Sequence, residues 1–352
     1  MSRDAGQIVL AGNTAGRERA GGHLWALAQW ALGLRAAGAR VSVAPGATAA
    51  ALAPIDAFGQ AEPDPADAAV LNVMGFAARA ELAAAGPWTF LDIDPGYPQM
   101  WRELGLADLL AGHDRFVTLG ANVGRPDCAI PDCGVEWIAT PPPVDVERWT
   151  PTPADEPGRA FTTVATWRNP YGTVSFDGVT YGSRVHEFRK FMELPRLVGA
   201  EFELALDVDA AETRDLAALE RNGWRLVEPR RVAGTPAAYR DYIRSSRAEL
   251  CVAQELYVAT RSGWLSDRSV CYLASGKPVL AQDTGLKDHY PVGEGLLTFS
   301  TLEEAAVGVE QIERDYERHS AAARALAEEH FDARTVLARL LERLTAPLGA
   351  TA

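Results

Sequence analysis

The chain has 352 residues, of which 47% are hydrophobic and 23% are charged. This balance is typical of a soluble globular protein and excludes long disordered or fibrous regions, and the length suits two α/β domains. With 34 Lys and Arg against 47 Asp and Glu, the formal net charge is −13, so we expect no nucleic-acid partner.

The sequence predicts a cytoplasmic protein without a transmembrane segment. Its start, MSRDAGQIVL, lacks the long apolar stretch of a signal peptide. Apolar runs elsewhere are shorter than the roughly 20 residues that span a bilayer. The four cysteines are interpreted as reduced thiols, because they neither form a disulfide scaffold nor show the spacing of a zinc site.

The first fifty residues predict a βαβ unit. An apolar strand at 8–13 is followed by a glycine-rich turn that ends at Gly21-Gly22-His23, and an amphipathic helix is expected from about 24 to 37. Residues 1–145 are therefore predicted to form one Rossmann-like domain. Its further strands are expected at 40–44, 68–75, 89–94 and 115–120.

A proline-rich linker at 146–158 separates this domain from a second one at 159–330. The prolines block both helix and interior strand. Apolar strands then alternate with helical patterns, which predicts a second Rossmann-like α/β domain. The strands are expected at 160–167, 201–208, 223–228, 248–253 and 277–283.

The tail from 301 to 344 is expected to form two or three helices, and residues 331–352 hold the terminal one. Asp332 can cap its start, and an apolar stripe follows at helical spacing. We expect this helix to cross back and pack on the first domain, while packing within the second domain is the alternative. The stripe consists of Val336, Leu337, Leu340, Leu341 and Leu344.

The most specific motif lies at 261–285. A Gly263-Trp264 pair precedes a helix at 266–274, and a Ser-Gly-Lys-Pro-Val turn leads to a strand and then to Asp283-Thr284-Gly285. The start of that helix presents free N–H groups that can bind phosphate oxygens. The strand delivers the last three residues to the carboxyl edge of the sheet, where ligands of open α/β folds bind.

This motif resembles the donor-site signature of GT-B glycosyltransferases, of the group that includes the family 1-like and family 4-like enzymes. The resemblance implies two Rossmann-like domains that face a cleft, with a nucleoside diphosphate sugar held by the second domain and a small-molecule acceptor by the first. The sugar nucleotide is a co-substrate, and no other cofactor is expected.

The resemblance also assigns site residues. Arg184 and Lys190 would neutralise the diphosphate, although a solvated helix face is the alternative for this basic run. His113 and Asp94 are the candidate catalytic residues, and His23 and Asn122 the candidate acceptor-binding residues. The full set of candidate donor-binding residues is Gly22, Trp167, Arg168, Arg184, Lys190, Ser262, Gly263, Trp264, Ser266, Asp267, Arg268, Asp283 and Thr284.

The sequence departs from the family pattern at one place. Many retaining members carry a Glu-x7-Glu pair whose second Glu grips the ribose of the nucleotide. Anchored on the Ser-Gly-x-Pro turn, these two positions are Gly263 and Cys271 in this chain. The ribose would then need another partner, with Ser266 and Asp267 as candidates, and the sequence does not predict retention of stereochemistry.

Asp92 and Asp94 form an Asp-x-Asp motif, which marks a divalent-metal site in glycosyltransferases of another fold. GT-B members generally work without metal, so we interpret the pair as loop or acceptor-side residues and expect no metal.

The sequence thus predicts a glycosyltransferase that moves a sugar to a small-molecule acceptor, as in natural-product biosynthesis. Two alternatives stay open. A nucleotide-sugar epimerase shares the fold and would need no acceptor, and a GT-B protein without activity could bind a nucleotide or partner.

Overall fold

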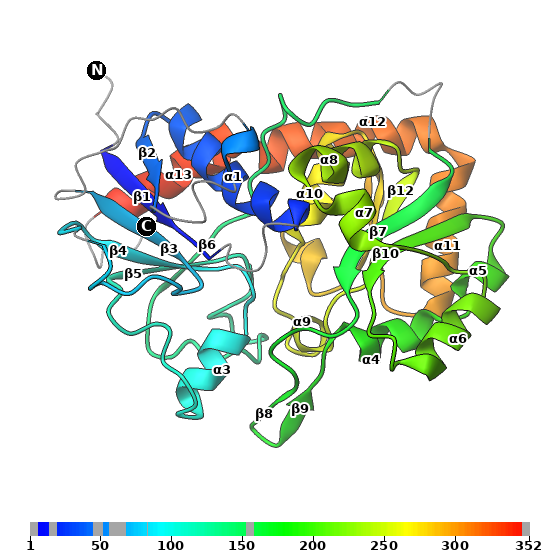
Figure 1. Cartoon of the computed structure of the whole chain (residues 1–352), viewed down its shortest axis with the longest axis horizontal. Helices are drawn as coiled ribbons and strands as arrows, with labels where there is room; N and C mark the ends of the chain where they lie inside the picture. The colour runs from blue at the N-terminus through cyan, green and yellow to red at the C-terminus, as the bar shows by residue number, and fades with distance from the viewer. Residues whose placement is uncertain are drawn as a thin grey trace.

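The computed structural model describes residues 6–13, 20–44, 52–55, 68–82, 84–152 and 158–346. Two α/β domains lie side by side in Figure 1, each built on a parallel six-stranded sheet. Part of the predicted glycine-rich turn and part of the predicted linker fall outside the described residues.

The first domain has a sheet whose strands all run parallel. Every strand predicted in this domain is confirmed, and β6 is an additional edge strand that is only three residues long. In spatial order the strands are β2 (Arg40–Val43), β1 (Gln7–Ala11), β3 (Ala69–Val73), β4 (Trp88–Asp92), β5 (Arg115–Thr118) and β6 (Trp137–Ala139). Its helices are α1 (Gly21–Ala36), η1 (Ala53–Ile55) and α3 (Tyr97–Glu103).

The sheet of the second domain has the spatial order of a classical dinucleotide-binding fold, in which the strand order reverses between β7 and β12. The five predicted strands are confirmed, and β14 was not predicted. The strands are β11 (Arg225–Val227), β10 (Glu201–Asp207), β7 (Ala160–Thr166), β12 (Ala248–Cys251), β13 (Val279–Gln282) and β14 (Leu296–Phe299). A separate antiparallel hairpin pairs β8 (Val174–Phe176) with β9 (Val179–Tyr181).

Helices surround this second sheet (Figure 1). Several begin at a side-chain cap: Thr235 accepts a hydrogen bond from Ala238 N, and Ser266 from Arg268 N. The helices are α4 (Arg184–Phe188), η3 (Arg189–Phe191), α5 (Leu194–Leu197), α6 (Thr213–Arg221), α7 (Pro229–Ala233), α8 (Pro236–Arg244), α9 (Glu255–Ala259), α10 (Asp267–Ala274), η4 (Leu286–Asp288), α11 (Leu302–Arg314), α12 (Tyr316–Leu326) and η5 (Ala327–Phe331).

Helix α1 is not amphipathic, so that part of the prediction is wrong. Its buried residues point in all directions, and they include Gln29 as well as Trp25 and Trp30. A helix that is apolar all round is one that is packed on several sides. The first sheet, α8, α10 and α13 (Ala333–Thr345) all pack against α1.

The terminal helix α13 crosses back to the first domain, as the sequence predicts. A Cβ on Gly33 of α1 would lie 2.6 Å from Leu337 and 2.7 Å from Ala333, so only glycine allows this approach. Arg343 donates to the Ala139 carbonyl at 3.1 Å, which ties the end of α13 to β6.

The chain therefore passes between the domains twice, and the two crossings run side by side. Val144 forms a parallel bridge with Asp332. The Val144 amide donates to Phe331 at 2.8 Å, and the Ala333 amide donates to Val144 at 2.9 Å.

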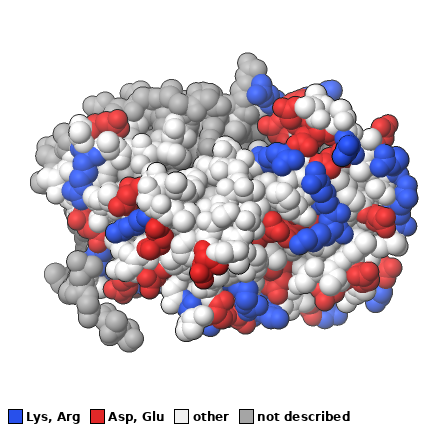
Figure 2. All heavy atoms as spheres, turned by 90° about the horizontal axis from the view of Figure 1, so that it is seen from below, with Lys and Arg blue, Asp and Glu red and all other residues white. Residues whose placement is uncertain are grey.

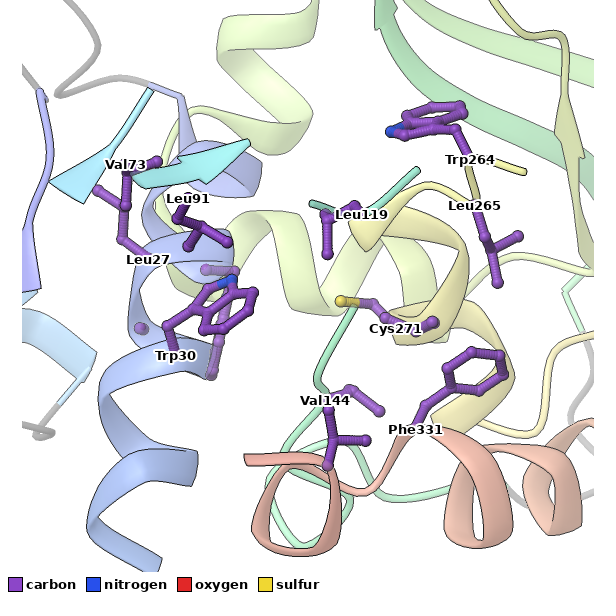
Figure 3. Packing of buried hydrophobic residues seen from close by; sticks show 14 of the residues in the cluster. Leu27, Trp30, Val73, Leu91, Leu119, Val144, Trp264, Leu265, Cys271 and Phe331 are labelled. Carbon is purple, nitrogen blue, oxygen red and sulfur yellow. The ribbon is translucent and has the colours of Figure 1, made fainter. Parts of the chain in front are cut away.

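One apolar core extends across both domains. Figure 3 shows Trp30 and Leu119 of the first domain in the same cluster as Trp264 and Cys271 of the second. A buried aromatic, Trp149, joins the two halves: its ring lies 5.0 Å from that of Trp25 and 6.1 Å from that of Tyr239. The two domains are thus held together by apolar packing as well as by the chain.

No helix in the described part of the chain is long and apolar enough to cross a bilayer. On the face seen in Figure 2, acidic and basic side chains are interspersed around a centre that is mostly uncharged.

The packing of α13 on α1 gives a first prediction. Leu337→Ala should lower the free energy of unfolding by about 2–5 kcal/mol, because Leu337 is fully buried against Gly33 and leaves a cavity. Arg339→Ala, on the exposed face of the same helix, should change it by about 0.5 kcal/mol or less. Urea unfolding checks both values, and equal effects of the two variants would contradict this packing.

Candidate substrate cleft

A cavity of about 860 Å³, called here the large cavity, lies between the carboxyl edges of the two sheets. From the first domain it is lined by the start of α1 and by the loops that follow β4 and β5. From the second domain it is lined by the ends of β7 and β10, by Glu228 and Arg230 after β11, and by the start of α10. This is the edge at which ligands of open α/β sheets bind.

A smaller space of about 200 Å³, called here the inner chamber, adjoins the large cavity. The two share Asp94, Thr166, Pro170, Trp264, Asp267 and Arg268 as lining residues. The inner chamber lies at the point where strand order reverses, because it is lined by Thr166, which ends β7, and by Gln254, which follows β12. Arg184, which follows β9, also lines it.

Arg184 bridges the two strands that diverge at this point. Its Nε donates to the Val252 carbonyl at 2.8 Å, and its Nη1 donates to the Thr166 carbonyl at 3.1 Å. Burial lowers the pKa of Arg184, and the nearby Arg268 guanidinium lowers it further. Within the described residues no carboxylate lies within 4.0 Å of this guanidinium, so a buried cation faces the chamber with only carbonyl partners.

The start of α10 brings Ser266, Asp267 and Arg268 to the same chamber. Ser266 caps the helix, and burial raises the pKa of Asp267. Arg268 is neutralised: it pairs with the fully buried Glu249 of β12 and also donates to the Val164 carbonyl at 2.9 Å. Burial opposes its charge, yet this pairing raises the pKa of Arg268.

Asp94 reaches the cleft from the first domain, after the end of β4. Tyr257 of α9 donates a hydrogen bond of 2.5 Å to its Oδ1. Burial, and then the charge of Asp94, raise the pKa of Tyr257 far above its usual range, so that the hydroxyl keeps its proton. The candidate catalytic carboxylate thus lies in both spaces, beside the buried Arg184.

A polar network links Tyr97 to three residues that line the inner chamber. Tyr97 of α3 donates to Gln254 at 3.1 Å, and Gln254 donates to Tyr257 at 3.1 Å. Asn169, in the loop after β7, donates to both Tyr97 and Gln254. The network joins the first domain to the second around the site.

Asn122 holds the domains together rather than lining the cleft. Its amide nitrogen donates to the Arg261 carbonyl at 2.7 Å, and its amide oxygen accepts from His289 Nε2 at 2.6 Å. A Cβ on Gly263 or Gly285 would lie 2.9 Å or 2.5 Å from atoms of Asn122, and both glycines have positive φ. This fully buried side chain therefore contributes to the contact between the domains.

The start of α1 places Gly22 and His23 at the large cavity. A Cβ on Gly21 would lie 2.3 Å from the Thr235 carbonyl oxygen, and one on Gly22 would lie 2.8 Å from the Tyr239 ring. Both glycines therefore permit a close contact between the domains. His23 Nε2 lies 2.8 Å from the Asn13 carbonyl oxygen.

Several predicted donor residues support the loops without lining either space. The indole of Trp167 is in the second domain's core and donates to Asp215 at 2.9 Å. Ser262 Oγ accepts from Trp264 N at 3.2 Å, and Thr284 Oγ1 donates to the Trp264 carbonyl at 2.7 Å. Asp283 caps the turn at Gly285, from whose amide it accepts at 2.8 Å.

Two other predicted residues are not brought to the cleft. Lys190 donates to Glu187 at 2.6 Å and lines neither space. His113 precedes β5, at the opposite edge of the first sheet, and packs edge-on against Trp88 and Phe90. Burial lowers the pKa of His113.

Arg168 and Trp264 do line the large cavity. Arg168 forms an ion pair with Glu212 at the rim, whereas the Trp264 indole donates to the Ile93 carbonyl at 3.3 Å across the domains. Gly120 and Trp264 also form an antiparallel bridge.

The sequence reasoning missed Thr166, Gln254, Tyr257 and Arg230. All four follow or end a strand of the second sheet at its carboxyl edge, or begin the helix after it. That placement rule would have identified Gln254, because β12 is one of the two strands at the reversal of strand order.

Cys271, at the position of the missing second Glu, does not line the cleft. Its thiol accepts a hydrogen bond from Gln29 of α1 at 3.5 Å and is buried. Asp267 lies one helical turn earlier on the same helix and lines both spaces.

Asp92 is a buried structural carboxylate. Its Oδ2 accepts hydrogen bonds from Gln99 at 2.7 Å and from Thr118 at 2.9 Å. Asp92 lines neither the large cavity nor the inner chamber. In the described part of the chain no three His, Cys, Asp or Glu side chains are grouped as metal ligands would be.

Asp92 gives a prediction on pH dependence. Burial raises its pKa to about 7, from a model-compound value of 3.8. The folded state then binds the proton more tightly than the unfolded state, so this group lowers stability as pH rises from about 4 to about 7. Relative to Asp92→Asn, the wild-type protein should lose a few kcal/mol of unfolding free energy over that window, roughly 1.4 kcal/mol per pKa unit. Urea unfolding at pH 4.5, 5.5 and 7 measures the difference, and a constant difference would contradict the shift.

Residues 207–344 match the family model described as "Glycosyl transferase-like". Comparison with curated proteins gives no match.

Solved structures resemble the chain over almost its whole length. The protein Alr3699/HepE from Anabaena, solved with UDP-glucose, has 14% identity and a TM-score of 0.59, over 96% of this chain and 99% of that one. An α-glucosyltransferase solved with UDP and a 13-mer DNA has 10% identity and a TM-score of 0.59, over 97% and 99%. A glycosyltransferase from Rickettsia africae has 13% identity and a TM-score of 0.52, over 98% and 99%. The chain therefore has the two-domain GT-B fold of the glycosyltransferases, and its C-terminal part carries the pattern of the glycosyl transferase-like family.

Proposed function

We propose that this protein transfers a sugar from a nucleoside diphosphate sugar to a hydroxyl group of a small-molecule acceptor. One observation carries the proposal: Arg184 is a buried cation with only carbonyl partners, at the reversal point of a sheet with dinucleotide-binding topology. A buried cation without a directly paired carboxylate is costly, and a bound diphosphate would supply such a direct negative partner.

The start of α10 supports the same position for the diphosphate. Its N–H groups and partial positive charge favour phosphate oxygens, and Arg268 is fixed beneath it. Similar structures solved with UDP and UDP-glucose support a nucleotide-sugar donor. We assign the ribose to Asp267, because Asp267 and not Cys271 lines the cleft.

Asp94 is proposed to act as the general base. The acceptor oxygen attacks the anomeric carbon of the sugar, and the bond from that carbon to the diphosphate oxygen breaks. The nucleoside diphosphate leaves with the electron pair, and the acceptor proton passes to Asp94. Arg184 and the start of α10 stabilise the charge on the leaving diphosphate.

A thermal-shift screen with UDP, GDP and ADP tests the donor site. A nucleotide at about 100 times its dissociation constant should stabilise the protein by roughly 2.7 kcal/mol. Stabilisation by none of these nucleotides or their sugar conjugates would contradict the proposal. Release of sugar-free nucleotide that depends on an acceptor distinguishes transfer from epimerisation, which needs no acceptor.

Arg184→Met should weaken binding of the stabilising nucleotide by about 1.5–3 kcal/mol, the range for hydrogen bonds to a charged group. Lys190→Met is the matched control, because its ammonium pairs with Glu187 and lies outside both spaces. Isothermal titration calorimetry measures both. Equal losses of nucleotide affinity in the two variants would show that the diphosphate does not bind in the inner chamber.

Asp94→Asn should lower kcat by roughly 10²- to 10⁴-fold, the range for loss of a general base. Donor affinity should stay within about twofold, because Asn can still accept the Tyr257 hydrogen bond. Steady-state kinetics and calorimetry separate the two effects. Full activity in Asp94→Asn would show that Asp94 is not the general base.

A further inference from the structure

The two walls of the large cavity differ in polarity. On the first-domain wall, Gly22, Ala26 and Trp30 follow each other at four-residue spacing and therefore share one face of α1. Ile93 and Leu119 continue this wall beyond the ends of β4 and β5. Among the described lining residues of that domain, only His23 and Asp94 carry polar side chains.

The second-domain wall of the same cavity is highly charged. Six of its described lining residues are acidic or basic: Arg168, Asp207, Glu228, Arg230, Asp267 and Arg268. A sugar nucleotide, with its many hydroxyl and phosphate oxygens, finds hydrogen-bond partners on this wall. A polyhydroxylated acceptor on the opposite wall would place its hydroxyls against Ala26, Ile93 and Leu119, where they would lose water without gaining partners from these three side chains.

We propose that the acceptor is a phenol or alcohol carried on an apolar ring system, and not a free sugar. This inference rests on the proposed transferase function and specifies its acceptor. The apolar rings lie along Ala26 and Trp30 of α1, and the single reacting hydroxyl points past Ile93 to Asp94. The apolar wall and one carboxylate at its end match such a molecule, with an apolar body and a polar tip.

Ala26 offers the sharpest variant. It is only partly buried on α1 and lines the cavity, so Ala26→Asp places a charge on the apolar wall without removing a side chain from the core. Ala36→Asp is the matched control, because Ala36 is exposed at the end of the same helix and outside the cavity. Circular dichroism verifies that both variants fold. Ala26→Leu, which fills the same space with an apolar group, gives a second variant should Ala26→Asp fail to fold.

The experiment measures binding of 2-naphthol and of D-glucose by calorimetry to protein saturated with UDP. We expect 2-naphthol to bind at least tenfold more tightly than D-glucose. Ala26→Asp and Ala26→Leu should each weaken 2-naphthol binding about tenfold or more and leave UDP affinity within twofold, while Ala36→Asp changes neither.

Three results overturn the inference while UDP still binds: D-glucose binds as tightly as 2-naphthol, 2-naphthol does not bind, or its affinity is unchanged in the Ala26 variants. Failure of UDP and of every other nucleoside diphosphate to bind the wild-type protein would instead reject the proposed function, and the acceptor assignment with it.

Discussion

The position of α1 is the constraint on which the cleft depends. Three contacts hold this helix. At its start, Gly21 lies against the backbone between α7 and α8, and Gly22 lies against the Tyr239 ring of α8. Further along, Gln29 donates a hydrogen bond to Cys271 of α10, and Gly33 packs against Leu337 of α13. Each contact comes from a different part of the chain. Because α1 contacts both domains, its packing positions its cavity face against the second domain in this structure, and the two sheets present their carboxyl edges to each other.

The positions of the charges in the site are also fixed by backbone contacts. The buried guanidiniums of Arg184 and Arg268 are fixed by carbonyls of β7 and of the segment after β12, so neither needs to move when an anion arrives. Fixed dipoles and charges of this kind are effective because reorganisation is avoided. Arg268 is paired directly with Glu249, whereas in the described part of the chain Arg184 has no direct carboxylate partner, and this difference favours Arg184 as the cation that a ligand would pair with.

Much of this fold could be predicted from the sequence, because parallel strands are apolar runs separated by turn signals. The strands β6 and β14 were missed, and their length of three and four residues does not explain this, because β11 is as short as β6 and was predicted. Side-chain direction was harder to predict. Trp167 and Arg168 are adjacent, yet Trp167 enters the core and Arg168 the cavity. Arg184 and Lys190 were grouped as one basic run, yet only Arg184 lines the chamber, since a six-residue separation places them on different faces.

The site was predicted best where it depends on backbone. The helix start at Ser266 and the turn glycines follow from local signals, and the structure has both. The role of Asn122 could not be predicted from the sequence, because its partners, Arg261 and His289, are 139 and 167 positions away. Contacts of this range depend on how the domains dock, which no local pattern encodes.

The bridge between Val144 and Asp332 has a mechanical consequence. Because the two crossing segments are hydrogen-bonded to each other, they act as one two-stranded connection and not as two independent linkers. Such a two-stranded connection bends readily out of the plane of its two segments, but it resists twisting and displacement within that plane. We therefore expect any widening of the cleft to be a rotation about this two-stranded connection.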